Sequence, residues 1–221
     1  MAFRIEAAII ALVAQTLLAA PVEHRHLHHG GAADLAVTDE GISFTEKGKH
    51  AAHSRTWKYD QIQQLELTSS TLRVLTYEDQ SLQLGRDREY VFDQLPKDFA
   101  PTVYAKWKDK LDQRFIAALA DPEVKTLAEF PAKLTGLTKG TEGTLRFAED
   151  RIVFQSPKPG ASRTWRLTDI DNIATAGPFD FTVTTFEHQG TWNTATREFH
   201  FQLQTPMEEA RFNDLWRRLH R

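Results

Sequence analysis

The chain has 221 residues, of which 41% are hydrophobic and 26% are charged, with a formal net charge of −3 and a pI near 6.3. This balance is that of an ordinary globular protein, and it argues against nucleic acid or another polyanion as a partner. The sequence contains no cysteine, which excludes disulfide bonds and lipid attachment through cysteine.

The first twenty residues have the pattern of a secretory signal peptide. Arg4 gives a positive start, an apolar run covers residues 7–14, and small residues precede Pro21. The run is too short to span a membrane, which requires about 20 apolar residues. We therefore expect export to the periplasm or the extracellular space, with cleavage after Ala19 or Ala20. The alternative is a cytoplasmic protein with an uncleaved N-terminal helix.

Residues 21–32 are predicted to form a polar, histidine-rich lead-in before the first folded unit. Its histidines are His24, His26, His28 and His29. Imidazole nitrogens suit zinc, copper or nickel, and alternate residues of an extended segment share a face. However, only Glu23 is adjacent to complete a ligand set. Two interpretations stay open: a site for zinc or copper with no other cofactor, or a solvated segment that binds no metal.

After this segment the sequence repeats itself. Ser-Arg-Thr-Trp occurs at residues 54–57 and again at residues 162–165. Further residues recur at a constant offset of 109: Thr76, Glu78, Gln80, Arg88, Glu89, Phe92 and Trp107 return as Thr185, Glu187, Gln189, Arg197, Glu198, Phe201 and Trp216. We interpret the chain as a tandem duplication of one fold. The predicted domains cover residues 33–120 and 141–221, joined by a linker over residues 121–140.

Each copy is predicted to begin with strands. A hairpin is expected from Leu35 to Thr45 in the first copy and from Thr144 to Phe154 in the second, because each has two short apolar runs around a turn. The repeated tryptophan then lies in a strand. Three more strands are expected in each copy, over residues 72–77, 81–84 and 89–92, matched by 181–186, 191–195 and 198–203.

A helix is predicted to close each copy. In the second copy it starts at a capping box formed by Thr205, Pro206 and Glu208, and its apolar stripe is Phe212, Leu215, Trp216 and Leu219. In the first copy a longer helix is expected from about Pro101 to Ala120, which would bridge the two copies. We interpret the repeated tryptophans, Trp57, Trp107, Trp165 and Trp216, as anchors of the core.

The second copy carries a pattern that points to a family. The pattern consists of Gly143, Leu145, Arg151, Ile152 and Phe154, followed by Leu167, Ile170 and Ile173 and then by further strands and one helix. It resembles the GRAM and bacterial pleckstrin-homology-like (PH-like) families. The first copy departs from the pattern at Ala33 and Gly41.

The resemblance implies a mainly β fold with C-terminal helices (α+β). Two tandem PH-like split barrels are expected, each a strongly bent antiparallel sheet capped by one helix, with Trp107 or Trp216 facing inward. Members of these families bind lipids, peptides or no known ligand, so the resemblance does not define a ligand.

A basic loop in the first copy is a candidate ligand-binding site. Lys47, Lys49 and Arg55 could contact an anionic lipid headgroup. The corresponding loop of the second copy, residues 156–160, is not especially basic, so we favour the interpretation of a solvated hairpin loop.

The sequence nominates no catalytic residue. No nucleophile lies in a strand–turn–helix context, and no glycine-rich loop could hold a phosphate. We therefore predict a non-catalytic, exported binding or scaffolding protein of the bacterial cell envelope, with a protein or lipid partner and no nucleic acid. The alternative is a protein that binds a transition metal through its histidines.

Overall fold

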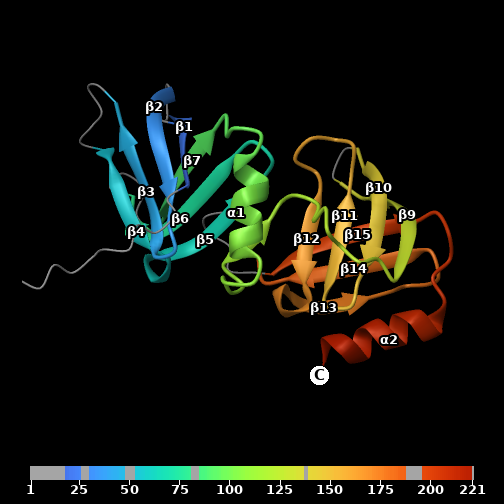
Figure 1. The fold of residues 1–221 in the computed structure, drawn as a ribbon. Helices are drawn as coiled ribbons and strands as arrows, with labels where there is room; N and C mark the ends of the chain where they lie inside the picture. Colours follow the sequence, from blue (N-terminus) through green and yellow to red (C-terminus); the bar gives the residue numbers. More distant parts are fainter. Residues whose placement is uncertain are drawn as a thin grey trace, which may run out of the picture.

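The computed structural model describes residues 18–25, 30–47, 53–80, 85–136, 139–187 and 196–220. The predicted fold class is confirmed at the level of a mainly β chain with two described α-helices, one of them C-terminal (Figure 1). The described strands form one open sheet with β4 (Arg55–Lys58) at one end and β13 (Ile170–Ala174) at the other. Neither described helix has the length and hydrophobicity of a membrane-spanning helix.

We term residues 18–111 the first half, residues 112–127 the connecting segment and residues 128–220 the second half. The first half contains β1 (Leu18–Arg25), β2 (Gly30–Val37), β3 (Gly41–Glu46), β4, the 3₁₀ turn η2 (Tyr59–Gln61), β5 (Ile62–Leu67), β6 (Leu72–Asp79), β7 (Asp87–Asp93) and α1 (Phe99–Trp107). The connecting segment contains β8 (Phe115–Ala117). The second half contains β9 (Ala128–Leu134), β10 (Thr141–Phe147), β11 (Arg151–Gln155), β12 (Arg163–Arg166), η3 (Leu167–Asp169), β13, β14 (Asp180–Thr185), β15 (Arg197–Leu203) and α2 (Glu209–Leu219).

The two halves have the same strand order. It is β5-β6-β7-β1-β2-β3-β4 in the first half and β13-β14-β15-β9-β10-β11-β12 in the second. The registers also match: Leu65 lies opposite Val74, and the corresponding Ile173 lies opposite Val183. A register shift occurs near the start of both β5 and β13. Both expected hairpins are present, as β2–β3 and β10–β11.

Each half has its own hydrophobic core. Side chains alternate between the two faces of a strand, so apolar residues at every second position collect on one face. β6 shows this directly, because Leu72, Val74 and Thr76 are buried and the residues between them are less so. The largest fully buried side chains include Trp107, Phe44 and Phe92 in the first half and Trp165, Phe154, Phe181 and Phe201 in the second.

A repeated polar contact explains why the tryptophan recurs together with distant residues. The indole nitrogen of Trp57 donates to Glu78 Oε1 at 3.0 Å, and the indole nitrogen of Trp165 donates to Glu187 Oε1 at the same distance. Buried indole N–H groups require an acceptor. The tryptophan and its glutamate are therefore retained together in both halves.

The N-terminal region differs from the expected lead-in. Leu18–Arg25 forms β1, which pairs with β2 and β7, and its residues Ala20, Val22 and His24 are buried. The segment 21–32 thus contributes to two strands of the first half. Residues 1–17 and 26–29 lie outside the described residues, as do the strands expected over 81–84 and 191–195.

The expected bridging helix over residues 101–120 and the expected linker over residues 121–140 are wrong. The helix α1 ends at Trp107, and after a turn the chain forms β8, whose three residues are all buried. The spacing of Trp107, Leu111 and Phe115 matches a helix, but burial of consecutive residues on both faces favours a strand inside a sheet. Residues 128–134 are β9, the first strand of the second half.

The C-terminal helix also departs from expectation. α2 begins at Glu209, after the expected capping box, and Glu208 has an extended backbone at the N-cap. Trp57, Trp107 and Trp165 are buried as expected, but Trp216 is 44% exposed. The interpretation of Trp216 as a core anchor is therefore wrong. Leu215, with Phe212 and Leu219, packs against the core instead.

A candidate binding cleft between the two halves

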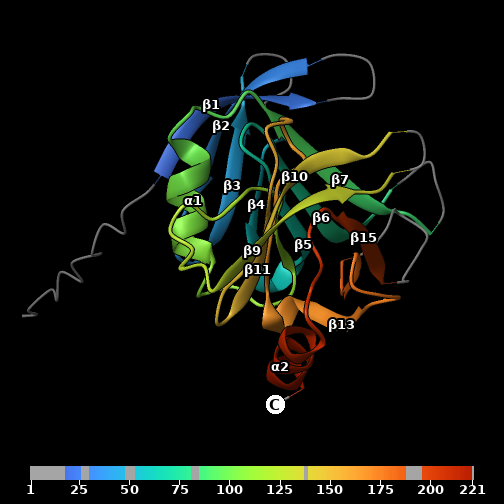
Figure 2. The same cartoon turned by 90° about the vertical axis from the view of Figure 1, so that its right-hand side faces the viewer.

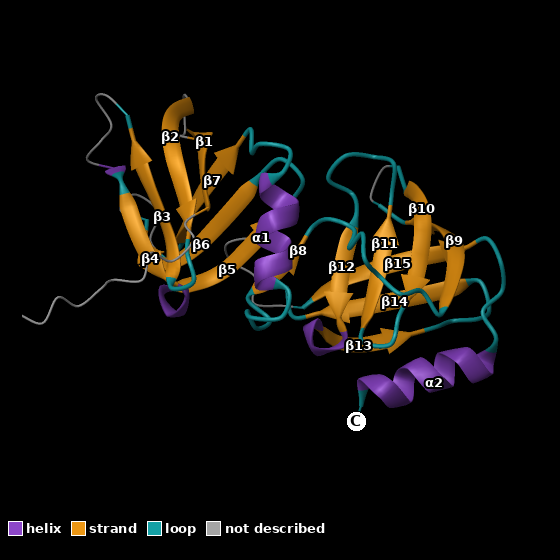
Figure 3. Ribbon diagram, in the orientation of Figure 1, coloured by secondary structure: helices purple, strands orange, loops and turns teal. Residues whose placement is uncertain are grey.

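The strand β8 connects the two halves. It runs parallel to β5, where Leu65, Glu66 and Leu67 lie opposite its three residues, and it pairs with β12 through Thr164. In Figure 3 it lies between α1 and the strands of the second half. α1 stands at this junction, whereas α2 lies apart from it beside the second half, as the views of Figure 1 and Figure 2 agree.

A buried ion pair lies in the junction. Arg151 in β11 contacts Asp121 of the connecting segment with 2.6 Å between Nη1 and Oδ2. The Tyr104 hydroxyl of α1 donates to the same oxygen at 2.9 Å. Because Asp121 is nearly inaccessible to solvent, its carboxylate depends on these donors for compensation. The pair therefore links α1, the connecting segment and the second half.

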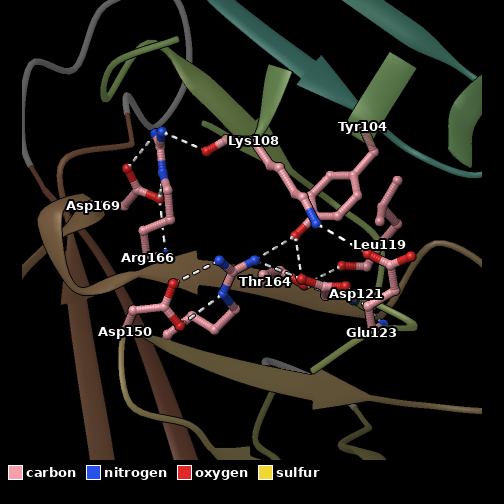
Figure 4. A network of polar contacts seen from close by, with 10 residues as sticks. Tyr104, Lys108, Leu119, Asp121, Glu123, Asp150, Thr164, Arg166 and Asp169 are labelled. Atoms are coloured by element: carbon pink, nitrogen blue, oxygen red, sulfur yellow. Dashed lines mark hydrogen bonds and ion pairs between the residues drawn. The ribbon is translucent and has the colours of Figure 1, made fainter. Parts of the chain in front are cut away.

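Thr164 adds two hydrogen bonds to the same junction (Figure 4). Its hydroxyl donates to the Leu119 carbonyl oxygen at 2.8 Å and accepts the Asp121 backbone N–H at 2.9 Å. Both partners belong to the connecting segment, so the hydroxyl fixes this segment against β12.

Arg166 holds the C-terminal end of α1. Its guanidinium donates to the carbonyl oxygens of Lys108, Leu111 and Asp112, and it is paired with Asp169 at 2.7 Å. The last carbonyls of a helix have no partner within the helix and carry partial negative charge. A cation from the second half thus compensates the C-cap carbonyl of α1 at Lys108, and it also fixes the turn after the helix through Leu111 and Asp112.

A cleft of about 480 Å³ lies beside this network, between α1, the connecting segment and the β11–β12 loop. Alanine, proline and leucine make up nine of its nineteen lining residues, among them Ala100, Ala105 and Leu119, and the remainder includes three serines and the carboxylates of Asp121 and Glu123. Lys97 and Lys158 also line it. Both lysines are exposed, and among the described residues neither has an acidic partner at ion-pair distance. The cleft has the size of a small-molecule site, with partly apolar walls and two cationic groups, Lys97 and Lys158, that have no acidic partner among the described residues.

The titratable groups beside the cleft are held in fixed protonation states by their neighbours. Burial, together with the hydrogen bond to Asp121, raises the pKa of the Tyr104 hydroxyl far above its usual range. The hydrogen bond to Asp150 raises the pKa of Arg151, and the same contact lowers the pKa of Asp150. The phenol therefore stays protonated and the arginine stays charged at neutral pH, which leaves neither as a proton acceptor.

The histidines predicted as metal ligands are only partly described. His24 is buried among the rings of Phe44 and Phe92, and its Nδ1 lies 2.5 Å from Glu46 Oε1. His53 Nδ1 lies 3.2 Å from the other oxygen of Glu46. His26, His28 and His29 lie outside the described residues. No group of three or more potential ligands is placed to hold a metal within the described ranges, and metal binding stays a prediction.

The basic loop predicted as a lipid contact is likewise incomplete. Lys47 pairs with Asp34 at 2.9 Å, and Arg55 donates to the Ser54 carbonyl oxygen at 2.9 Å. Lys49 lies outside the described residues. Neither Lys47 nor Arg55 lines the cleft, and lipid contact through this loop stays a prediction.

Two signals in the sequence indicate features that the sequence-based expectations lacked, one at the junction and one in β1. Arg151 stands where the first copy has Gly41, and this difference marks an arginine with a role in the second half only. Pro21 and Pro131 share an offset of 110, as do Ile42 and Ile152, which extends the repeat back into β1. Asp121 could not be found in this way, because it lies outside the repeat.

The comparisons with known proteins give structural similarities alone. No protein-family model and no curated protein matches the chain. Among solved structures, the C-terminal domain of an unknown protein from Leishmania infantum is 14% identical, with a TM-score of 0.32 over 44% of this chain and 85% of that one. The Spt16D Pob3N heterodimer is 10% identical, with a TM-score of 0.32 over 86% of this chain and 98% of that one. Similarities at this level carry no functional conclusion.

Proposed function

We propose that this chain is a non-catalytic binding protein of the bacterial cell envelope, built from two PH-like modules, and that the cleft between them binds an amphiphilic anion. The proposed ligand has an apolar part and an acidic group, as a fatty acid or an anionic phospholipid has. The observation that carries the proposal is the cleft of about 480 Å³, with small apolar walls and the unpaired ammonium groups of Lys97 and Lys158 among the described residues.

The modular part of the proposal rests on the equivalence of the two halves. Both have the same strand order, matching registers and a separate core. The tryptophan–glutamate contact occurs in both at one distance. Duplication of one module accounts for all of these features together.

The ligand class follows from the chemistry of the cleft. Alanine, proline and leucine side chains gain from covering an apolar chain, since they offer no hydrogen bonds that a polar ligand could use. The lysines attract a negatively charged group at the rim. Lys108 also lines the cleft, but it is paired with Glu123 at 3.2 Å and contributes less net charge.

Calorimetry with myristate and with phosphatidylglycerol vesicles tests the proposal and separates a free fatty acid from a membrane lipid. We expect Ala105→Trp to abolish binding, because Ala105 is exposed on α1 and the indole would fill the cleft. The double variant Lys97→Ala, Lys158→Ala should weaken binding about three- to tenfold.

Matched controls are available elsewhere on the surface. Ala210→Trp places the same bulk on the exposed side of α2, and Lys133→Ala removes a lysine from β9. Both should bind as the wild type does. Unchanged binding by Ala105→Trp, or no binding by the wild type to either probe, contradicts the proposal.

Export is proposed from the signal-peptide pattern of residues 1–20. A mature chain that starts at Pro21 keeps Val22 and His24 of β1 and loses Leu18 to Ala20. Intact-mass measurement on protein from the envelope fraction of the native host should give this shorter chain. A full-length mass in the cytoplasmic fraction contradicts export.

A further inference from the structure

We infer that the open edge of β13, together with Trp216, is a docking site for an extended peptide from a partner protein, which adds to the sheet as β8 adds to β5. The peptide that fits has a basic residue, then an aromatic, an aliphatic and a small residue. This site is separate from the cleft and does not depend on the proposed ligand.

The first half shows what this edge accepts. β8 lies parallel to β5, the Leu65 backbone N–H donates to the Arg114 carbonyl oxygen at 2.7 Å, and the Ala118 N–H donates to the Leu67 carbonyl oxygen at 2.8 Å. The ring of Phe115 packs on Trp107, with centroids 5.3 Å apart and an angle of 74° between the rings. One short strand thus completes the edge of β5 and covers the helix tryptophan.

Among the described residues, the second half has the same edge without this strand. β13 corresponds to β5, and it is the last described strand at its end of the sheet. Ile173 corresponds to Leu65, because each lies opposite the matching valine of the next strand. Its N–H therefore faces the side on which β8 lies in the first half. An open strand edge of this kind pairs readily with another extended chain.

The side chains of β13 are more exposed than the corresponding side chains of β5, as expected if β13 lacks a neighbouring strand among the described residues. Gln64 and Glu66 of β5 are half-buried, whereas the corresponding Asn172 and Ala174 of β13 are exposed. Trp216 recurs at the sequence offset of Trp107, but Leu215 takes the core position in α2, and Trp216 is 44% exposed and stacks on the C-cap residue His220 with ring centroids 4.2 Å apart. α2 itself contacts β13. The tryptophan is thus available to an aromatic side chain delivered along this edge.

Charge complementarity defines the first residue of the peptide. In the first half, Arg114 precedes Phe115 and donates to the Tyr59 carbonyl oxygen at 2.7 Å. In the second half, the exposed carboxylate of Asp171 lies near the start of β13, and no ion pair to it is found among the described residues. A basic residue before the aromatic one would meet this carboxylate.

The test uses a labelled, capped peptide with the sequence of residues 113–119, Gln-Arg-Phe-Ile-Ala-Ala-Leu. Fluorescence polarisation gives the affinity for the full chain, and amide NMR shifts locate the site. We expect the largest shifts at Ile173 and Thr175, and an affinity at least roughly tenfold weaker for Trp216→Ala. Asp171→Asn should weaken binding about two- to fivefold.

Controls separate docking on the edge from non-specific adhesion. Tyr77→Ala removes another exposed aromatic side chain and should leave binding unchanged. A peptide N-methylated at the nitrogen that corresponds to Ala118 lacks the backbone donor and should not bind.

Three results overturn the inference. They are no binding at millimolar peptide, equal binding of the N-methylated peptide, and equal binding by Trp216→Ala. A concentration-dependent dimer that Trp216→Ala abolishes would instead assign the edge to a second copy of the chain. If the wild type binds neither myristate nor phosphatidylglycerol vesicles but still binds the peptide, the docking site stands without the proposed function.

Discussion

The helices α1 and α2 close equivalent halves of the molecule but have different surroundings. Trp107 in α1 is fully buried, whereas its counterpart Trp216 in α2 is 44% exposed. In α1 the tryptophan itself lies in the core and also packs on Phe115 of the connecting segment, whereas in α2 the neighbouring Leu215 takes the core position. A repeated residue therefore does not guarantee a repeated environment.

The largest effect is expected from truncating the two helix tryptophans. Trp107→Ala should lower the free energy of unfolding by about 3–5 kcal/mol, because it leaves a cavity in a packed core. Trp216→Ala should lower it by less than about 1 kcal/mol, since much of this side chain is already in water. Urea unfolding of both variants measures the two values. Equal losses would mean that the two helices are packed alike, and the comparison would fail.

A smaller effect is expected at the repeated threonine of β4 and β12. Thr164→Val removes a hydroxyl that makes two hydrogen bonds to the connecting segment, which should cost about 1–2 kcal/mol. Thr56 is the corresponding residue, and it is exposed in β4 at the open end of the sheet. Thr56→Val should change stability by less than about 0.5 kcal/mol. Thermal unfolding measures both variants. Similar losses of stability in Thr164→Val and Thr56→Val would mean that the hydrogen bonds of Thr164 to the connecting segment do not stabilise the junction.

The smallest effect concerns the pH dependence of stability. Burial raises the pKa of Glu187, and the nearby Arg163 and Arg197 oppose this rise only in part. Above the ordinary glutamate pKa of about 4.3, the unfolded chain releases a proton that the folded chain still holds. The contribution of Glu187 to stability therefore falls as pH rises from that value through the raised folded pKa.

Glu187→Gln removes this titration and keeps an oxygen that can accept the Trp165 N–H. Its unfolding free energy should fall less than that of the wild type between about pH 4 and the folded pKa of Glu187. Denaturant titrations at a series of pH values give both curves. A steeper fall of the unfolding free energy with pH in Glu187→Gln than in the wild type would contradict a raised pKa for Glu187.

The sequence predicted most of the strands because alternation and the repeat support each other. The hairpins at Leu35–Thr45 and Thr144–Phe154 are present as expected. The connecting segment was missed for a physical reason: Trp107, Leu111 and Phe115 have a helical spacing, while β8 is a strand because it pairs with β5 on one side and β12 on the other. Tertiary contacts therefore override the local pattern.

The candidate site was less accessible to sequence reasoning than the fold. Asp121, Tyr104 and Arg151 are far apart in the sequence, and only the docking of the two halves brings them together. The histidine run drew attention because of its composition, but the described member, His24, occupies the position of Leu134 and points into the core. Composition identifies unusual segments, whereas the position within the repeat shows which face of a strand a residue occupies.

Amide hydrogen exchange at Leu65 and Ile173 tests the central claim most directly. The two amides occupy equivalent positions, but the Leu65 N–H donates to Arg114 of the connecting segment and the Ile173 N–H faces an edge without a neighbouring strand in the described chain. The account predicts slow exchange at Leu65 and exchange at least roughly a hundredfold faster at Ile173, which the docked peptide should then slow. Equal protection of both amides in the free protein would show that the edge of β13 is already paired, and would contradict the account.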